Sequence, residues 1–174
     1  DLSGAVRLAW DGECLYVGVE VKDQHFRQEH TGVMTWAGDS IQVAADPLPG
    51  ERQEYHQMSM DYTKKFSEYI LALTTNGPSV YRSGSWDRRR PVGPVGPQDV
   101  RLAVRRTDNG LVYEAAFSWE SLSMERPDPG RAIGLALTLN DRDEADGPFQ
   151  GMEWFGGILY AKDPDKFGQV VLQP

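Results

Sequence analysis

Hydrophobic residues alternate with polar or small residues along much of the chain, and this pattern predicts short β-strands. Between residues 14 and 22, Leu15, Val17, Val19 and Val21 fall on every second position, the spacing of a strand with one buried face. Further strands are predicted by the same alternation over residues 5–10, 41–45, 67–75, 100–107, 111–117, 132–140, 152–160 and 168–172. We therefore expect about nine strands and little helix.

Turn residues separate these strands at short intervals. Asp11-Gly12 lies between the first two, and Asp108-Asn109-Gly110 lies between residues 100–107 and 111–117, so both pairs are predicted to form hairpins. Turns that recur roughly every eight to twelve residues are typical of an antiparallel sandwich. The sequence thus predicts an all-β fold, an antiparallel β-sandwich of jelly-roll or immunoglobulin-like type. We interpret residues 1–174 as one domain excised from a larger protein.

Two stretches lack the alternation and are predicted to be loops. Residues 23–35 are polar and hold His25 and His30. Because no periodicity brings these histidines onto one face, we interpret them as solvated rather than as metal ligands. Residues 80–97 are rich in Gly, Pro, Ser and Arg and are interpreted as a long exposed connection. Trp86 within it is either held against the core or available to a ligand.

Composition and charge exclude several classes of protein. The net charge of −8 argues against a nucleic-acid partner, and the basic cluster Arg88-Arg89-Arg90 is interpreted as a solvated loop. No apolar run is long enough to span a bilayer, so no membrane insertion is expected. The single cysteine, Cys14, cannot form an internal disulfide. The chain opens without a secretion signal, so its compartment cannot be read directly.

The segment 35–46 holds the first candidate for a binding surface. Ile41, Val43 and Ala45 form the predicted core face of a strand, which leaves Gln42 on the other face, close to Trp36. A flat ring can stack on a pyranose while an amide bonds to its hydroxyl groups, so this pair is typical of a sugar-binding surface. The alternative is a tryptophan buried beneath a loop.

An acidic loop at residues 141–147 is a candidate calcium site. Asp141, Asp143 and Asp146 offer carboxylate oxygens at close spacing, which is the ligand type that calcium prefers. The loop lacks the regular interval and the distal glutamate of an EF-hand. A solvated acidic turn is the alternative interpretation.

Catalytic motifs are absent from the sequence. No glycine-rich phosphate loop follows a strand, and no Ser, Cys or His lies in a recognised nucleophile setting. Paired carboxylates could be drawn from the 26 acidic residues, but the sequence singles out none of them. We therefore expect no catalysis from this chain alone.

The ordered series of motifs resembles the family 9 carbohydrate-binding modules. The resemblance extends from near the first residue to the last strand, and it depends on the order and spacing of several short pieces. These pieces are Val6-Arg7-Leu8-Ala9-Trp10-Asp11, Leu15-Tyr16-Val17, Val21-Lys22-Asp23, Trp36-Ala37-Gly38-Asp39-Ser40, Tyr113-Glu114-Ala115-Ala116-Phe117-Ser118-Trp119, Ile133-Gly134-Leu135, Leu139-Asn140-Asp141 and Asp163-Pro164-Asp165-Lys166-Phe167-Gly168.

This resemblance implies a non-catalytic module that binds polysaccharide or oligosaccharide ends between two tryptophans, with structural calcium nearby. It also implies tethering to a secreted bacterial xylanase or related enzyme, and hence an extracellular or periplasmic location. Trp36 matches the first tryptophan, whereas Ala161 stands where the second is expected. The neighbouring Tyr160 and the upstream Trp154 are candidates for a substitute wall, and Trp86 is a further candidate.

Other positions depart from the pattern of the family. Gln42 stands where sugar-binding members carry an acidic residue, and Ile70 and Ala72 stand where they present an Arg and an Asn. Two alternatives therefore stay open. One is a haem-binding domain of the related DOMON type, in which Met58 or Met60 would ligate iron. The other is a structural or interaction domain that has kept the fold and lost the sugar.

Overall fold

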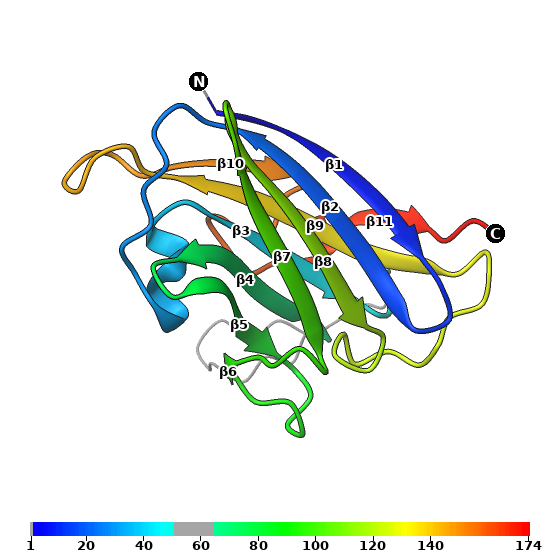
Figure 1. Cartoon of the computed structure of the whole chain (residues 1–174). Coiled ribbons are helices and arrows are strands. Elements are labelled where there is room, and N and C mark those ends of the chain that lie inside the picture. The colour runs from blue at the N-terminus through cyan, green and yellow to red at the C-terminus, as the bar shows by residue number, and fades with distance from the viewer. Residues whose placement is uncertain (1, 51–64) are drawn as a thin grey trace.

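The computed structural model describes residues 2–50 and 65–174, which form two antiparallel sheets packed face to face (Figure 1). The smaller sheet has four strands in the order β1 (Ser3–Trp10), β2 (Cys14–Lys22), β8 (Gly110–Ser118) and β7 (Val100–Thr107). The larger sheet has seven strands, and its path runs β10 (Gln150–Trp154), β9 (Ala132–Asp141), β3 (Ser40–Asp46), β4 (Ser67–Thr74), β5 (Gly77–Ser85) and β6 (Gly93–Pro94), with β11 (Gly168–Val171) also paired to β9. This arrangement confirms the predicted β-sandwich.

The hydrophobic core lies between the two sheets. The predicted inward face of β2 is confirmed, because Leu15, Val17 and Val19 are each only 1% exposed. The larger sheet contributes the alternate residues of β3, β4 and β9 to the same core. Tyr69 of β4 and Phe117 of β8 meet edge to face, with ring centroids 5.2 Å apart. Burial of these faces in a common core is the main stabilisation of a sandwich of this kind.

The exposed connection predicted for residues 80–97 is wrong in its first part. Gly77–Ser85 forms β5, which pairs along β4 after a tight turn at Gly77, whose φ is +97°. The inward positions of β5 include Arg82, which is buried and donates from Nε to the Tyr69 hydroxyl. A polar side chain satisfied in this way occupies a core-facing position without an apolar signal in the sequence. The Gly, Pro, Ser and Arg content of this segment therefore did not indicate the strand.

The strand predicted over residues 152–160 is too long. β10 spans Gln150–Trp154, and Phe155 (φ +58°) and Gly157 (φ +99°) then turn the chain out of the sheet. Ile158, which follows this turn, is buried in a small cluster against the outer face of the larger sheet, together with Ala44, Phe66, Ala136 and Phe167. The segment that follows β10 therefore covers that face.

The loop predicted for residues 23–35 contains the start of a short helix. The 3-10 helix η1 (Gly32–Ala37) includes Trp36, and a second one, η2 (Pro164–Lys166), precedes β11. All seven residues of β3 are buried. This strand is thus covered on both faces, by the core on one side and by irregular segments on the other.

No helix within residues 2–50 and 65–174 is long and apolar enough to cross a membrane.

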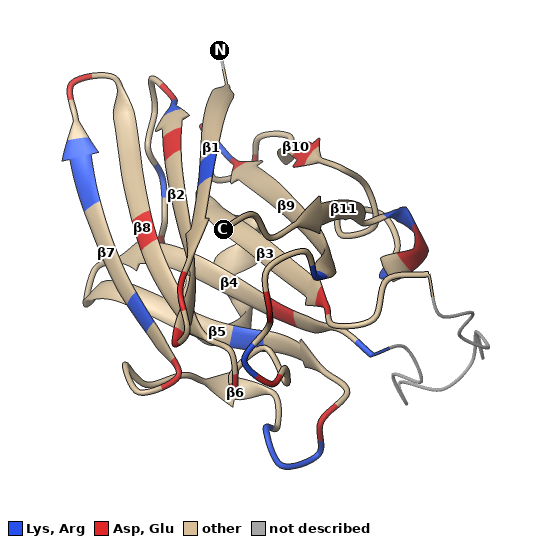
Figure 2. Cartoon of the chain, turned by 90° about the vertical axis from the view of Figure 1, so that its right-hand side faces the viewer, with Lys and Arg blue, Asp and Glu red and all other residues tan. Residues whose placement is uncertain are grey.

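The charged residues are distributed over both sheets and their loops (Figure 2). Within the basic cluster, Arg89 forms an ion pair with Asp87 at 2.9 Å, and Arg90 contacts Asp99 and Glu120. Arg89 and Arg90 therefore have acidic partners on the same molecule, which argues against a phosphate site. The side chain of Arg89 is 88% exposed, as expected for a solvated loop, whereas that of Arg90 is only 16% exposed, so the solvated interpretation is wrong for Arg90.

Candidate functional site

A cavity of about 420 Å³ opens on the outer face of the larger sheet. Its floor comes from β3 and β4, one side from η1 and Phe149, and the other side from the segment after β10. Its apolar lining consists of Val33, Trp36, Ile70, Phe149, Ile158, Leu159, Tyr160 and Ala161, and its polar lining consists of Gln42, Glu68, Ser83 and Lys162. The cavity thus combines an aromatic wall with a row of hydrogen-bonding groups, as binding sites for small polar molecules do.

Trp36 forms the aromatic wall and is 40% exposed. Its ring meets Phe149 edge to face, with centroids 5.7 Å apart. η1 is held in place by Gln28, whose amide donates to the carbonyl oxygens of Thr35 (2.8 Å) and Asp39 (3.1 Å). The buried alternative for Trp36 is therefore wrong, because the residue is 40% exposed and lines the cavity.

The polar side of the cavity is centred on the carboxylate of Glu68. Its Oε1 accepts hydrogen bonds from Gln42 Nε2 (2.7 Å), Ser83 Oγ (2.8 Å) and Lys162 Nζ (2.8 Å). Asn140 Nδ2 in turn donates to Gln42 Oε1 at 3.0 Å. These contacts fix the Gln42 amide with its nitrogen toward Glu68 and its oxygen toward Asn140. A connected network thus leads from the interior of the sheet to the rim of the cavity.

The segment after β10 forms the other side of the cavity and is fixed by Glu153. The carboxylate of Glu153 accepts hydrogen bonds from the backbone N–H groups of Ile158 (2.8 Å) and Leu159 (2.7 Å). Gly157 makes the turn possible, because a Cβ atom there would lie 2.3 Å from the carbonyl oxygen of Asp163. The wall that includes Ala161 and Lys162 therefore depends on this turn.

Replacing Gly157 by alanine is expected to lower the midpoint of thermal unfolding and to loosen this wall. Both the positive φ and the backbone clash oppose a side chain at this position. Gly130→Ala is the matched control, because its φ is +90° but nothing lies within 4 Å of the added Cβ. Calorimetry should show a larger loss for Gly157→Ala than for Gly130→Ala. Equal losses would mean that the close approach to Asp163 is unimportant.

The cavity brings together some of the residues predicted from the sequence and leaves others out. Trp36, Gln42 and Tyr160 line it, and Tyr160 is 92% exposed. Trp86 is partly buried and lies outside the cavity lining. Trp154 is also partly buried and packs against the core, with its ring centroid 4.6 Å from that of Phe155. These two tryptophans therefore do not contribute to this wall.

Sequence reasoning missed Glu68, Ser83, Lys162 and Phe149. Glu68 could have been found, because it is two residues before Ile70 and so on the same face of β4. Ser83 lies on β5, which was not predicted as a strand. Ala161 and Ile70 do line the cavity, as the resemblance implied, although their side chains are apolar. Met58 and Met60, the candidate haem ligands, lie outside the described residues.

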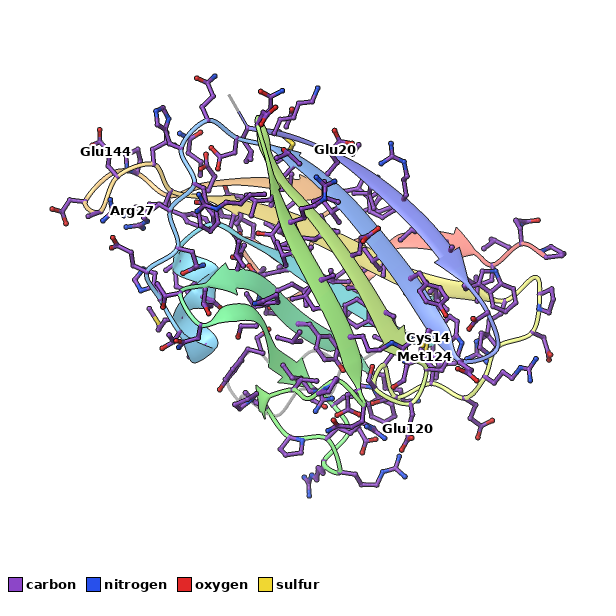
Figure 3. All side chains as sticks on the ribbon, viewed as in Figure 1. Cys14, Glu20, Arg27, Glu120, Met124 and Glu144 are labelled. Atoms are coloured by element: carbon purple, nitrogen blue, oxygen red, sulfur yellow. The ribbon has the colours of Figure 1, made fainter. Side chains whose placement is uncertain are left out.

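A group of aspartates lies where three loops meet at one end of the sandwich. Ligand oxygens of Asp23, Asp141 and Asp143 all lie within 4.8 Å of one another. Asp39 lies beside them and accepts hydrogen bonds from the backbone N–H groups of Arg27 (2.6 Å) and Arg142 (2.9 Å). Figure 3 shows Arg27 and Glu144, on the two loops that Asp39 joins, at the same end of the molecule.

Burial and the charges of neighbouring carboxylates raise the pKa values of Asp39 and Asp141. Burial raises the pKa of Asp39 to about 8, against the two backbone hydrogen bonds, and the charge of Asp23 adds to the rise. Burial likewise raises the pKa of Asp141, as do the charges of Asp23 and Asp143. Asp141 Oδ1 is buried and has no hydrogen-bond partner within residues 2–50 and 65–174. A divalent cation would both satisfy this oxygen and relieve the repulsion, so the residues present fit calcium.

The composition of this group differs from the prediction. Asp141 and Asp143 belong to it, but the described part of the chain offers Asp23 as the third carboxylate instead of Asp146. The loop turns back at Gly147, whose N–H donates to the carbonyl oxygen of Glu144, and Asp146 is exposed on this turn. His25 Nδ1 lies 3.7 Å from Asp143 Oδ1 with its side chain largely exposed, in keeping with a solvated histidine.

The fold and the cavity together define a β-sandwich binding domain with an open aromatic wall. The family model for the carbohydrate family 9 binding domain-like proteins matches residues 1–174, so the chain belongs to this family. The family resemblance noted from the motifs is thereby confirmed. A family of binding domains also agrees with the expectation that the chain has no catalysis of its own.

Comparisons with individual proteins agree with this assignment. Over 168 residues the chain is 23% identical to endo-1,4-beta-xylanase A of Thermotoga maritima, and it spans 96% of its own length but only 14% of that enzyme. Its fold is similar to that of a family 9 carbohydrate binding module from Caldicellulosiruptor kristjanssonii, solved with cellotriose and with glucose. In both comparisons the TM-score is 0.72 at 19% identity, with 99% of this chain covered and 75% or 77% of the other.

Proposed function

We propose that this chain is a non-catalytic carbohydrate-binding module that holds a sugar against Trp36. The observation that carries the proposal is an exposed indole facing the same cavity as Gln42, Glu68 and Lys162. The indole would stack on the apolar face of a pyranose, while Gln42 and Lys162 would bond to its hydroxyl groups. Tyr160, exposed at the rim, would supply a second and weaker aromatic contact.

The setting of the module is inferred from its similar proteins. The structures with cellotriose and glucose support a ligand of the oligosaccharide class, and the xylanase similarity supports attachment to a carbohydrate-active enzyme. Such enzymes act on polysaccharides outside the cell, so we infer an extracellular or periplasmic location. Calcium held by Asp23, Asp141 and Asp143 would have a structural role, because the group lies outside the lining of the cavity.

Titration calorimetry against a panel of oligosaccharides tests this proposal. The panel should include cellotriose, xylotriose, glucose and oligogalacturonate, with the intact chain and calcium present. We expect saturable binding of at least one neutral member with one site per chain. Absence of heat or of any saturable binding across the whole panel would contradict the proposal.

A further inference from the structure

The cavity contains an ion pair, Glu68–Lys162, that was not among the contacts expected from the family resemblance. We infer that Lys162 is the charged donor to the hydroxyl groups of the sugar and that Glu68 neutralises it, so that the cavity selects neutral sugars rather than uronic acids. This inference rests on the proposed function, since it names the class of sugar bound in the same cavity.

Glu68 is a fixed counter-charge rather than a free ligand-binding group. It is 1% exposed, and its Oε1 already receives hydrogen bonds from Gln42, Ser83 and Lys162. A buried carboxylate is strongly disfavoured unless it is paired and hydrogen-bonded, so these three donors stabilise Glu68 in its buried position opposite the lysine. The acidic group expected at position 42 is thus supplied by the neighbouring strand instead.

Lys162 is positioned to contact a ligand. Its ammonium group lies 2.8 Å from Glu68 Oε1, and its side chain is 39% exposed at the lining of the cavity. An ammonium has three N–H donors, so those not used by Glu68 can reach ligand oxygens. Hydrogen bonds from a charged donor are roughly twice as strong as neutral ones. Lys162 adjoins Ala161 and therefore offers a polar contact where the second aromatic wall is missing.

The pairing decides which sugars benefit from the lysine. A hydroxyl group accepts a hydrogen bond from Lys162 without adding charge. The carboxylate of a uronic acid bound to the same nitrogen would lie within about 6 Å of the Glu68 carboxylate, twice an ordinary hydrogen-bond length. At that separation, inside a partly enclosed cavity, repulsion by Glu68 offsets much of the attraction by Lys162. Because Coulomb energy falls with distance, the pair leaves an anion about half of the attraction that an unpaired lysine would give. The larger cost of removing a carboxylate from water offsets this remainder, so a uronic acid is not favoured over a neutral sugar.

Calorimetry with matched neutral and acidic sugars tests this inference. The probes are glucose with glucuronate and galactose with galacturonate, each titrated into the wild-type chain, Lys162→Met and Glu68→Gln. The wild-type chain is expected to bind each neutral sugar at least as tightly as its uronic acid. Lys162→Met should weaken binding of the neutral sugars by about tenfold, the usual effect of losing a charge-assisted hydrogen bond. Glu68→Gln leaves the lysine charge unpaired and should shift the ratio of affinities toward the uronic acid by about tenfold.

Lys166→Met is the matched control, because Lys166 lies outside the cavity lining and its ammonium group is 3.9 Å from Asp163. It should bind like the wild-type chain. Thermal unfolding checks that each variant folds; if Glu68→Gln does not, Lys162→Met alone decides. Wild-type affinity for neutral sugars in Lys162→Met, or tighter binding of uronic acids by the wild-type chain, would overturn the inference and leave the proposed function standing. A wild-type chain that binds no sugar would overturn both.

Discussion

Trp36→Ala is expected to weaken oligosaccharide binding by about 10- to 100-fold, in line with the loss of about 1 to 3 kcal/mol for a ring that stacks on its ligand. Trp36 is 40% exposed and its ring packs in a T-shaped arrangement with Phe149, so its removal should affect the cavity more than the fold. Calorimetry with the tightest-binding member of the panel measures the loss, and thermal unfolding checks the fold.

Trp86→Ala is the control for this prediction. It also removes a partly buried indole, but from a position outside the cavity lining. Its affinity for the oligosaccharide should stay within about twofold of the wild-type value, the usual range for a residue that does not contact the ligand. A Trp36→Ala variant that binds as tightly as Trp86→Ala would mean that the sugar does not stack on Trp36.

Calcium is expected to have the largest effect on stability. A ligand that binds only the folded state at 100 times its Kd adds about 2.7 kcal/mol to the free energy of unfolding. Asp23, Asp141 and Asp143 converge, and Asp141 Oδ1 has no hydrogen-bond partner in the described part of the chain, so a bound cation should raise the thermal midpoint. Differential scanning calorimetry with added calcium, and after chelation, measures the shift.

Two aspartate variants locate the cation. Asp141→Asn should remove most of the calcium-dependent shift, because it deletes one of the two buried carboxylates of the group. Asp146→Asn should keep the shift, because Asp146 is exposed on the same loop but outside the group. Identical unfolding midpoints with and without calcium would contradict the metal site. A shift lost equally in both variants would place the ion elsewhere on the loop.

The alternation of apolar residues was sufficient to predict most strands, because a sandwich turns one face of each strand toward the common core. It failed at β5, where Arg82 occupies an inward position by bonding to Tyr69, a contact that has no signal in the local sequence. It also failed after Trp154, where the positive φ values of Phe155 and Gly157 end the strand. The local pattern of residues cannot predict that a polar side chain will face the core when its hydrogen-bond partner lies on another strand.

The candidate site was predictable from the sequence only where its residues lie close together along the chain. Trp36 and Gln42 come from adjoining elements, so their proximity followed from a turn and a strand. Glu68 and Lys162 are 94 residues apart, and only the folded sheet brings them together. Asp23 similarly joins Asp141 and Asp143 from a distant loop. Sites assembled from separate segments need the topology, which alternation alone does not supply.

An NMR titration with oligosaccharide tests the central claim, that sugar binds in the cavity beside Trp36, most directly. The chain has five tryptophans, so the indole N–H signals give five separate reporters. We expect the Trp36 signal to shift and saturate together with the backbone signals of residues 158–162, while Trp10 and Trp119, whose indoles are bonded to backbone carbonyls elsewhere, stay in place. Saturating shifts confined to the four-stranded sheet, with Trp36 unmoved, would contradict the account.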